Sequence, residues 1–255
     1  MGTSASNRGS GGASPLVPPW ADLDNQGPGP ESDSQRFRGF RTTLGRFVSG
    51  GDAGVGRSAL GRFVSSGLGG SAIATRRFAP AISAGGKLSE LVADLAQGGS
   101  GESVVGFDVS ALRGHETTVV IERIVDALCP TGTIDDEATR TALDEALSAV
   151  LSDRPEFDPD AMSLEMLEEL LVKFTEEEIY LKVIAESGDA FDKVADPVIL
   201  MDREIQLREL VRVVVDKDGR ALLSETTKNF QKGTYDRVVR ELFATVLRAF
   251  EDYVE

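Results

Sequence analysis

The second residue of the chain carries the simplest reactive chemistry in the sequence. Gly2 is small enough to permit removal of Met1, which would leave the α-amine of a glycine at the N-terminus. The pKa of such an amine lies near ~8, against about 10.4 for a lysine side chain, so a useful fraction is unprotonated at neutral pH. No side chain hinders its attack on an activated carboxyl group. The opening therefore predicts an acylation substrate modified at Gly2, and the alternative is that residues 1–35 are an ordinary linker.

A segment that could hold a nucleotide is Gly51–Ser58, which matches a P-loop except that Arg57 stands where lysine belongs. In a P-loop the glycines let backbone N–H groups surround the phosphates, and the lysine reaches the terminal oxygens. That geometry needs a buried strand before the loop and a helix after it. Here both flanks are copies of the hexapeptide Leu-Gly-Arg-Phe-Val-Ser, at 44–49 and 60–65. We therefore predict a Gly-rich turn between two short helices.

The other residues that could do chemistry are isolated. His115 is the only histidine and Cys129 the only cysteine, so neither a nucleophile relay nor a zinc site is recognisable. A run of acids in the segment 163–178 is typical of a solvated helix face, with the alternative that it docks a basic partner. These acids are Glu165, Glu168, Glu169, Glu176, Glu177 and Glu178. We expect no catalytic residue, no metal and no cofactor, and hence a protein that is not an enzyme.

The net charge of −15 hides an asymmetry along the chain. Residues 36–87 contain nine basic side chains and one acid, whereas residues 88–255 are strongly acidic. The basic residues of interest are Arg46, Arg57, Arg62, Arg76 and Arg77. Such a segment could bind nucleic acid or an acidic partner, or it could pack against the chain's own acidic body. Few lysines and few interleaved aromatic residues favour the intramolecular or protein-partner interpretation.

No part of the sequence points to a membrane or to secretion. No stretch approaches the ~18 apolar residues that span a bilayer, and the N-terminus lacks the apolar core of a signal peptide. The single cysteine excludes a disulfide framework and fits a reducing compartment. We therefore expect a cytoplasmic protein.

The elements that must position these residues are helices. Residues 1–35 are rich in Gly, Ser, Pro and Asp, which predicts a disordered tail. Residues 36–86 predict a basic Gly/Arg-rich arm of short helices, and residues 87–255 predict an acidic all-α domain. Residues 238–253 show a clear 3.6-residue apolar face, whereas residues 198–215 are apolar almost all round, so we place the latter helix centrally. The predicted fold class is all-α, with the tail and arm ahead of a helical body.

Four stretches form a further pattern: Met1–Ser4, Gly11–Trp20, Arg36–Gly39, and Arg62–Ser71 with the following Arg76-Arg77. Together they resemble the QatB family, a component of the four-component Qat anti-phage defence systems of bacteria. The resemblance covers roughly the N-terminal third of the chain. The acidic remainder is similar only in character and rough length. The duplicated hexapeptide is a departure from the family pattern.

The resemblance implies three partner proteins, namely a P-loop ATPase (QatA), a QueC-like enzyme (QatC) and a TatD-like nuclease (QatD). It also implies that the QueC-like enzyme activates a deazaguanine carboxylate with ATP, and that the Gly2 amine attacks it in place of ammonia. On this interpretation Gly2 receives a covalent 7-deazaguanine, and Thr3, Ser4 and an apolar plug are recognition elements. The plug consists of Pro15, Leu16, Val17, Pro18, Pro19 and Trp20. The chain would also be an adaptor to the ATPase; the alternative is a nucleic-acid-binding or scaffold protein that uses the basic segment 36–87.

Overall fold

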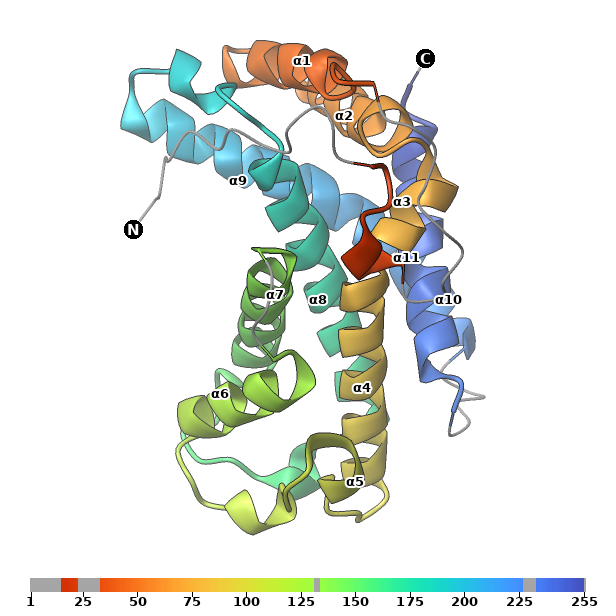
Figure 1. The fold of residues 1–255 in the computed structure, drawn as a ribbon. Coiled ribbons are helices and arrows are strands. Elements are labelled where there is room, and N and C mark those ends of the chain that lie inside the picture. The colour runs from red at the N-terminus through yellow and green to blue at the C-terminus, as the bar shows by residue number, and fades with distance from the viewer. Residues whose placement is uncertain (1–14, 23–32, 131–133, 227–232, 255) are drawn as a thin grey trace. The chain divides into compact units, whose positions relative to one another are not determined.

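The computed structural model describes residues 15–22, 33–130, 134–226 and 233–254. Helices make up most of these ranges and no strand occurs within them, which confirms the all-α prediction (Figure 1). The predicted disordered tail falls mainly on residues 1–14 and 23–32, which lie outside the described residues. None of the helices in the described ranges is long and apolar enough to cross a bilayer. The helices are α1 Arg38–Val48, α2 Ala53–Arg62, α3 Ser71–Arg77, α4 Ala79–Ala96, α5 Glu102–Val105, α6 Thr117–Leu128, α7 Ile134–Leu151, α8 Leu164–Ala185, α9 Pro197–Val214, α10 Arg220–Thr226 and α11 Tyr235–Glu251.

The chain forms two compact units, and each gathers separate stretches of sequence. Unit 1 consists of Met1–Ala79, Ile179–Asp218 and Phe243–Glu255. Unit 2 consists of Pro80–Glu178 and Gly219–Leu242. Composition divides the chain into consecutive segments instead, because composition does not register contacts between distant stretches. The residues expected to form a basic arm contribute α1, α2 and α3 to unit 1.

The duplicated hexapeptide builds the core of unit 1. Leu44, Phe47 and Val48 of the first copy are buried, and so are Leu60, Phe63 and Val64 of the second. The ring of Phe63 lies 5.2 Å from that of Phe40 and 6.2 Å from that of Phe37, measured between centroids. Each copy therefore supplies a buried Leu, Phe and Val to unit 1, since a helix places residues three and four apart on one face.

The segment Gly51–Ser58 does not form a P-loop. It follows the helix α1 where a P-loop needs a buried strand, and most of it is already part of α2. Asp52 begins α2 as its N-cap, with the side-chain oxygen accepting a hydrogen bond from the backbone N–H of Val55 at 3.0 Å. Gly50 has a φ of 118°, which favours glycine in the turn between the two helices.

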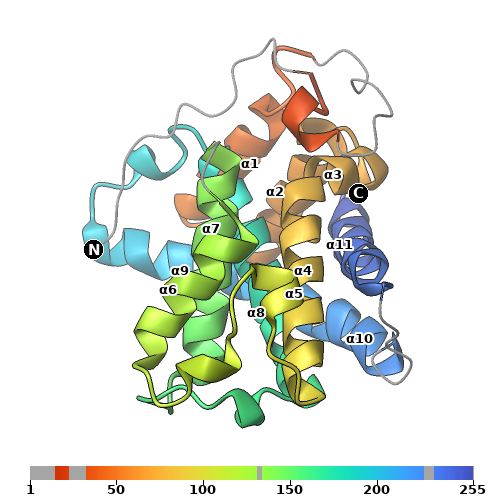
Figure 2. The same ribbon diagram turned by 60° about the horizontal axis from the view of Figure 1, so that its bottom comes forward.

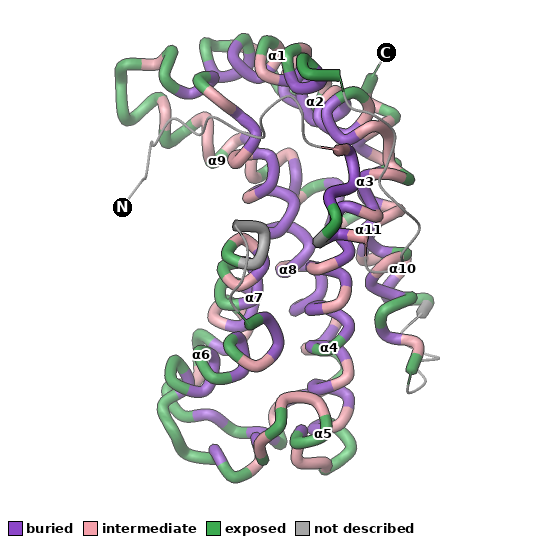
Figure 3. Tube along the Cα trace, in the orientation of Figure 1, coloured by how far each residue is buried: buried purple, intermediate pink, exposed green. Residues whose placement is uncertain are grey.

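The central position predicted for residues 198–215 is wrong. In α9 the side chains of Val198, Met201 and Ile205 are 70 %, 59 % and 58 % exposed, and burial is confined to its second half (Figure 3). Val198, Met201 and Ile205 lie on a face that no described part of the chain covers. Hydropathy alone could not distinguish this half-covered helix from a buried one.

In unit 2, α6 and α7 lie side by side (Figures 1 and 2). The buried residues of these helices include Ile121 and Ile124 of α6 and Leu143 and Leu147 of α7. The solvated face predicted for the acids of α8 is correct for Glu165, which is exposed. It is wrong for the last three acids of the set, because Glu176, Glu177 and Glu178 are buried, with Glu178 only 1 % exposed.

Candidate functional site

Residues 15–22, called here the docked segment, pack against the helices of unit 1, to which they belong. Pro18 has the extended backbone typical of proline, and a single 3₁₀ turn, Pro19–Ala21, follows it. Val17 is fully buried and Leu16 is 8 % exposed. A Cβ atom on Gly69 would lie 2.7 Å from Leu16 Cδ1, so only glycine leaves room for this leucine; its φ of +84° also favours glycine.

The end of the docked segment is held by an ion pair. The carboxylate of Asp22 lies 3.2 Å from Nη2 of Arg76 on α3. Both side chains are largely buried, with 13 % of Asp22 and 24 % of Arg76 exposed. A short apolar stretch that could not fold alone is therefore fixed by apolar burial at one end and by charge at the other.

The apolar plug is expected to be a recognition element for a partner, but its described residues are largely buried in their own chain. Leu16, Val17 and Pro18 are buried, Pro15 is half-buried and Pro19 is exposed. Trp20 belongs to the 3₁₀ turn, and its side chain is outside what is described. Gly2, Thr3 and Ser4 lie outside the described residues. Recognition of a partner by these residues stays a prediction, whereas the described plug residues contact their own chain.

Two of the five basic residues of interest pair with acids of the same chain. Arg76 pairs with Asp22, and Nη2 of Arg77 lies 3.6 Å from Oε1 of Glu186. Arg62 is half-buried, whereas Arg46 and Arg57 are exposed on α1 and α2. The two pairs correspond to the intramolecular interpretation of the basic segment. The exposed pair of arginines leaves part of the charge available to solvent.

Glu186 organises a cluster of buried charges in unit 1. The Nε atom of Arg41 donates a hydrogen bond to the backbone oxygen of Glu186 at 2.9 Å, and Nη2 of Arg41 lies 3.5 Å from its carboxylate. Burial, together with the charge of Arg77, lowers the pKa of Lys182 to about 7 despite the attraction of Glu186. Burial likewise lowers the pKa of Arg36 and of Arg77. One carboxylate thus faces several cations in a poorly hydrated environment.

Sequence reasoning missed this cluster. Arg36, Arg41 and Arg77 belong to the N-terminal basic segment, whereas Lys182 and Glu186 lie at the end of α8 and just after it. Neither spacing nor composition connects residues so far apart in the chain. The one available signal was the isolation of positive charge in residues 36–87, which requires either a partner or a carboxylate from elsewhere.

The model of the family described as "Qat anti-phage system associated protein QatB" matches residues 69–250, which is more than half of the chain. The matched range contains α3 to α10 and most of α11, whereas the docked segment, α1 and α2 precede it. No curated protein and no solved structure matches the chain.

Proposed function

Because the chain belongs to the QatB family, we propose that it serves the Qat anti-phage system as a protein substrate, with Gly2 as the modified residue. The donor in this proposal is a QueC-like partner that activates the carboxylate of a 7-deazaguanine with ATP. The Gly2 amine attacks the activated carbonyl carbon, an amide bond forms, and the activating group leaves as the amine loses a proton. The family description names an association with a defence system and no catalytic activity, which agrees with a substrate role.

The docked segment is the observation that supports this proposal. It ties the chain to unit 1 at Leu16 and Val17, so that Gly2 precedes a fixed anchor. The stretch from Gly2 to Pro15 spans at most about 45 Å when fully extended. That length is enough to enter an active-site channel while the anchor stays in place, and the anchor keeps the amine at a high effective concentration near a partner bound to the body. Thr3 and Ser4 are then the residues the enzyme reads beside Gly2.

The first prediction is a covalent adduct on Gly2. We expect mass spectrometry of the N-terminal peptide to show a deazaguanine-sized mass increase when the chain is produced with its Qat partners. The increase should be absent when the QueC-like partner carries an inactivating substitution, because that enzyme supplies the activated carboxylate. A bare Gly2 beside an active partner would contradict the substrate role.

A variant of the anchor tests how the docked segment contributes. Val17→Asp places a charge at a fully buried position and is expected to detach the segment from unit 1. We expect slower modification of Gly2, since the amine would no longer be held near the partner. Pro19→Asp is the matched control, because Pro19 is exposed in the same segment.

We also propose that the chain is an adaptor to the ATPase partner, through the exposed face of α9. Val198, Met201 and Ile205 are separated by three and four residues, so they share one side of the helix. Contiguous exposed apolar side chains of this kind mark protein–protein contacts. An apolar face of one helix fits a groove or helix on the partner.

The prediction for this face concerns co-purification. Met201→Asp combined with Ile205→Asp is expected to abolish recovery of the ATPase with the chain, because two carboxylates would have to be desolvated in the contact. Modification of Gly2 should persist if the QueC-like partner binds elsewhere. Val119→Asp is the control, since Val119 is a 45 % exposed valine on α6. Unchanged recovery of the ATPase with the double variant would remove α9 from the interface.

A further inference from the structure

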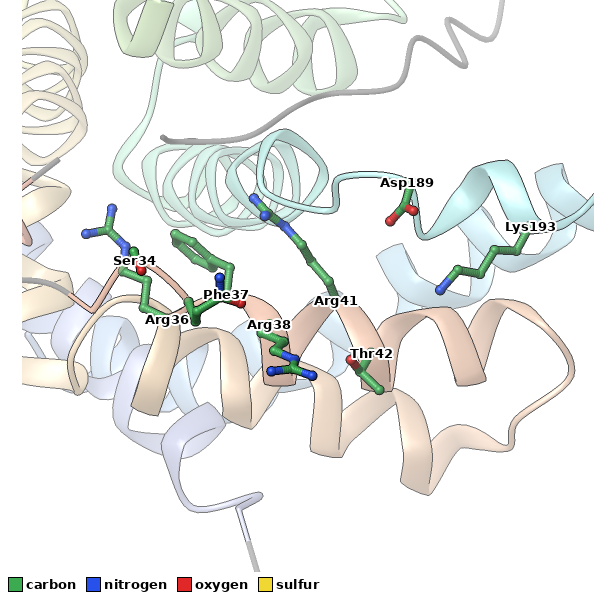
Figure 4. A pocket seen from close by; sticks show the side chains of 9 residues that line it. Ser34, Arg36, Phe37, Arg38, Arg41, Thr42, Asp189 and Lys193 are labelled. Carbon is green, nitrogen blue, oxygen red and sulfur yellow. The ribbon is translucent and has the colours of Figure 1, made fainter. Parts of the chain in front are cut away.

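A cavity of about 250 Å³ lies at the start of α1, and most of its charged lining is cationic (Figure 4). Arg36, Arg38 and Arg41 line it from the start of α1, and Lys193 lines it from a short 3₁₀ helix, Phe191–Lys193. Asp189 is the one acidic side chain in this lining. Every one of these residues belongs to unit 1.

Two of the cations are held in place by their surroundings. The guanidinium of Arg41 is fixed by its bonds to Glu186, and it lies 5.6 Å from the centroid of the Phe37 ring. Arg36 is buried, with its guanidinium 5.1 Å from the same centroid. Cation–π contacts and burial restrict both side chains, so part of the positive lining is preorganised.

The other two cations point their charges into accessible space. Arg38 and Lys193 are exposed, and neither side chain makes a hydrogen bond or an ion pair within the described part of the chain. The side chain of Lys193 packs against Gly45 of α1. A Cβ atom on Gly45 would lie 2.7 Å from Nζ of Lys193. Glycine at this position therefore lets the ammonium group lie against α1, in the direction of Arg41 and Thr42 (Figure 4).

We propose that this cavity binds a phosphoryl group, carried either by a free nucleotide or by the backbone of a nucleic acid. Guanidinium groups match the tetrahedral oxygens of phosphate in two-point contacts, and a lysine adds a compact charge. The N-terminus of an eleven-residue helix, α1, which has no side-chain cap, adds a favourable field. The volume suits one or two phosphoryl groups and is smaller than sites that enclose whole organic ligands.

The charge arrangement explains why an anion is the expected ligand. Asp189 neutralises only part of the lining, and Glu186 is engaged with Arg41 and Arg77. Burial lowers the pKa of Arg36, and the charges of Arg77 and Arg41 act in the same direction. A bound dianion would relieve this repulsion, whereas a neutral or cationic ligand would leave it. The site is independent of any modification of Gly2.

The test is a titration of the full-length chain with pyrophosphate, ADP and a short single-stranded DNA, followed by calorimetry. We expect saturable binding that Arg38→Gln combined with Lys193→Gln weakens by about tenfold or more, since contacts between charged groups are the strong ones. Arg46→Gln is the control, because Arg46 is an exposed arginine of α1 outside the cavity. Gly45→Ala is a second variant that displaces the amine of Lys193 without removing a charge, and it should weaken binding as well.

The outcomes assign the source of the phosphate or overturn the site. Binding of pyrophosphate and ADP that depends on Arg38 and Lys193 identifies a free nucleotide. Binding of the DNA alone, with the same dependence, identifies a nucleic-acid backbone. The proposal is overturned if none of the three probes binds at low salt. It is equally overturned if Arg46→Gln weakens binding as much as the double variant does, because the attraction would then be diffuse.

Discussion

Replacing Glu186 by alanine is expected to lower the free energy of unfolding by about 3–5 kcal/mol, the usual cost of leaving buried cations without their counter-charge. The carboxylate lies 3.5 Å from Nη2 of Arg41 and 3.6 Å from Nη2 of Arg77. It also opposes the burial that lowers the pKa of Arg36 and Lys182.

Urea denaturation of a set of variants separates this effect from a simple loss of packing. Glu186→Gln keeps the shape of the side chain and should still destabilise, because the charge is what the arginines require. Adding Arg77→Met to Glu186→Ala should recover part of the loss by removing one uncompensated cation. Asp192→Ala is the control on an exposed acid and should change stability by less than about 0.5 kcal/mol. A loss at Glu186→Ala no larger than that of the control would show that the cluster is hydrated.

The second large effect is a pH-dependent gain in stability from Glu178→Gln. Burial raises the pKa of Glu178 from 4.5 to about 8. Between these two values the folded chain holds a proton that the unfolded chain has released, so stability falls as pH rises through this window and stays low above it. Glutamine mimics the protonated acid and avoids the loss. We expect the variant to match the original chain near pH 4 and to exceed it increasingly up to about pH 8, above which the difference levels off; the steepest change is about 1.4 kcal/mol per pH unit.

The effect is best measured as the difference in free energy of unfolding between Glu178→Gln and the original chain, with both denatured at the same series of pH values. Lys182 acts in the opposite sense, because its pKa is lowered from 10.5 to about 7 and stability then rises with pH between these values. That contribution is common to both chains and cancels in the difference. Glu165→Gln is the control on the same helix, since hydrogen bonds from its own backbone and from Ser163 hold the pKa of Glu165 below its usual range. A flat difference for Glu178→Gln would place its carboxyl group in contact with water.

The sequence predicts where the helices form better than it predicts which of their faces are buried. The apolar face of α11 is correct from Val238 to Phe250, because a 3.6-residue period directly reports which side of a helix is covered, whereas Tyr253, beyond the end of the helix, is only half-buried. The predicted exposure of the α8 acids and the predicted burial of the α9 apolar residues are wrong for the same reason. Whether a residue is buried depends on which distant segments pack against its helix. Glu178 is therefore buried although it is acidic, and Val198 is exposed although it is apolar. The Glu186 cluster and the cavity beside α1 unite residues that lie far apart in the chain, which local patterns cannot register.

Unit 1 is built from stretches that are far apart in the chain, which determines when it can fold during synthesis. The surface that holds the docked segment includes α3, and the backbone N–H of Ser71 at its start donates a hydrogen bond to Glu251 near the end of the chain. Gly61 likewise lies against the carbonyl of Phe250. Unit 1 can therefore close only after Phe250 and Glu251 have left the ribosome. On the proposal that Met1 is removed, the amine of Gly2 would be exposed while its anchor is still unfinished, and a co-translational partner would meet the amine before the folded body does.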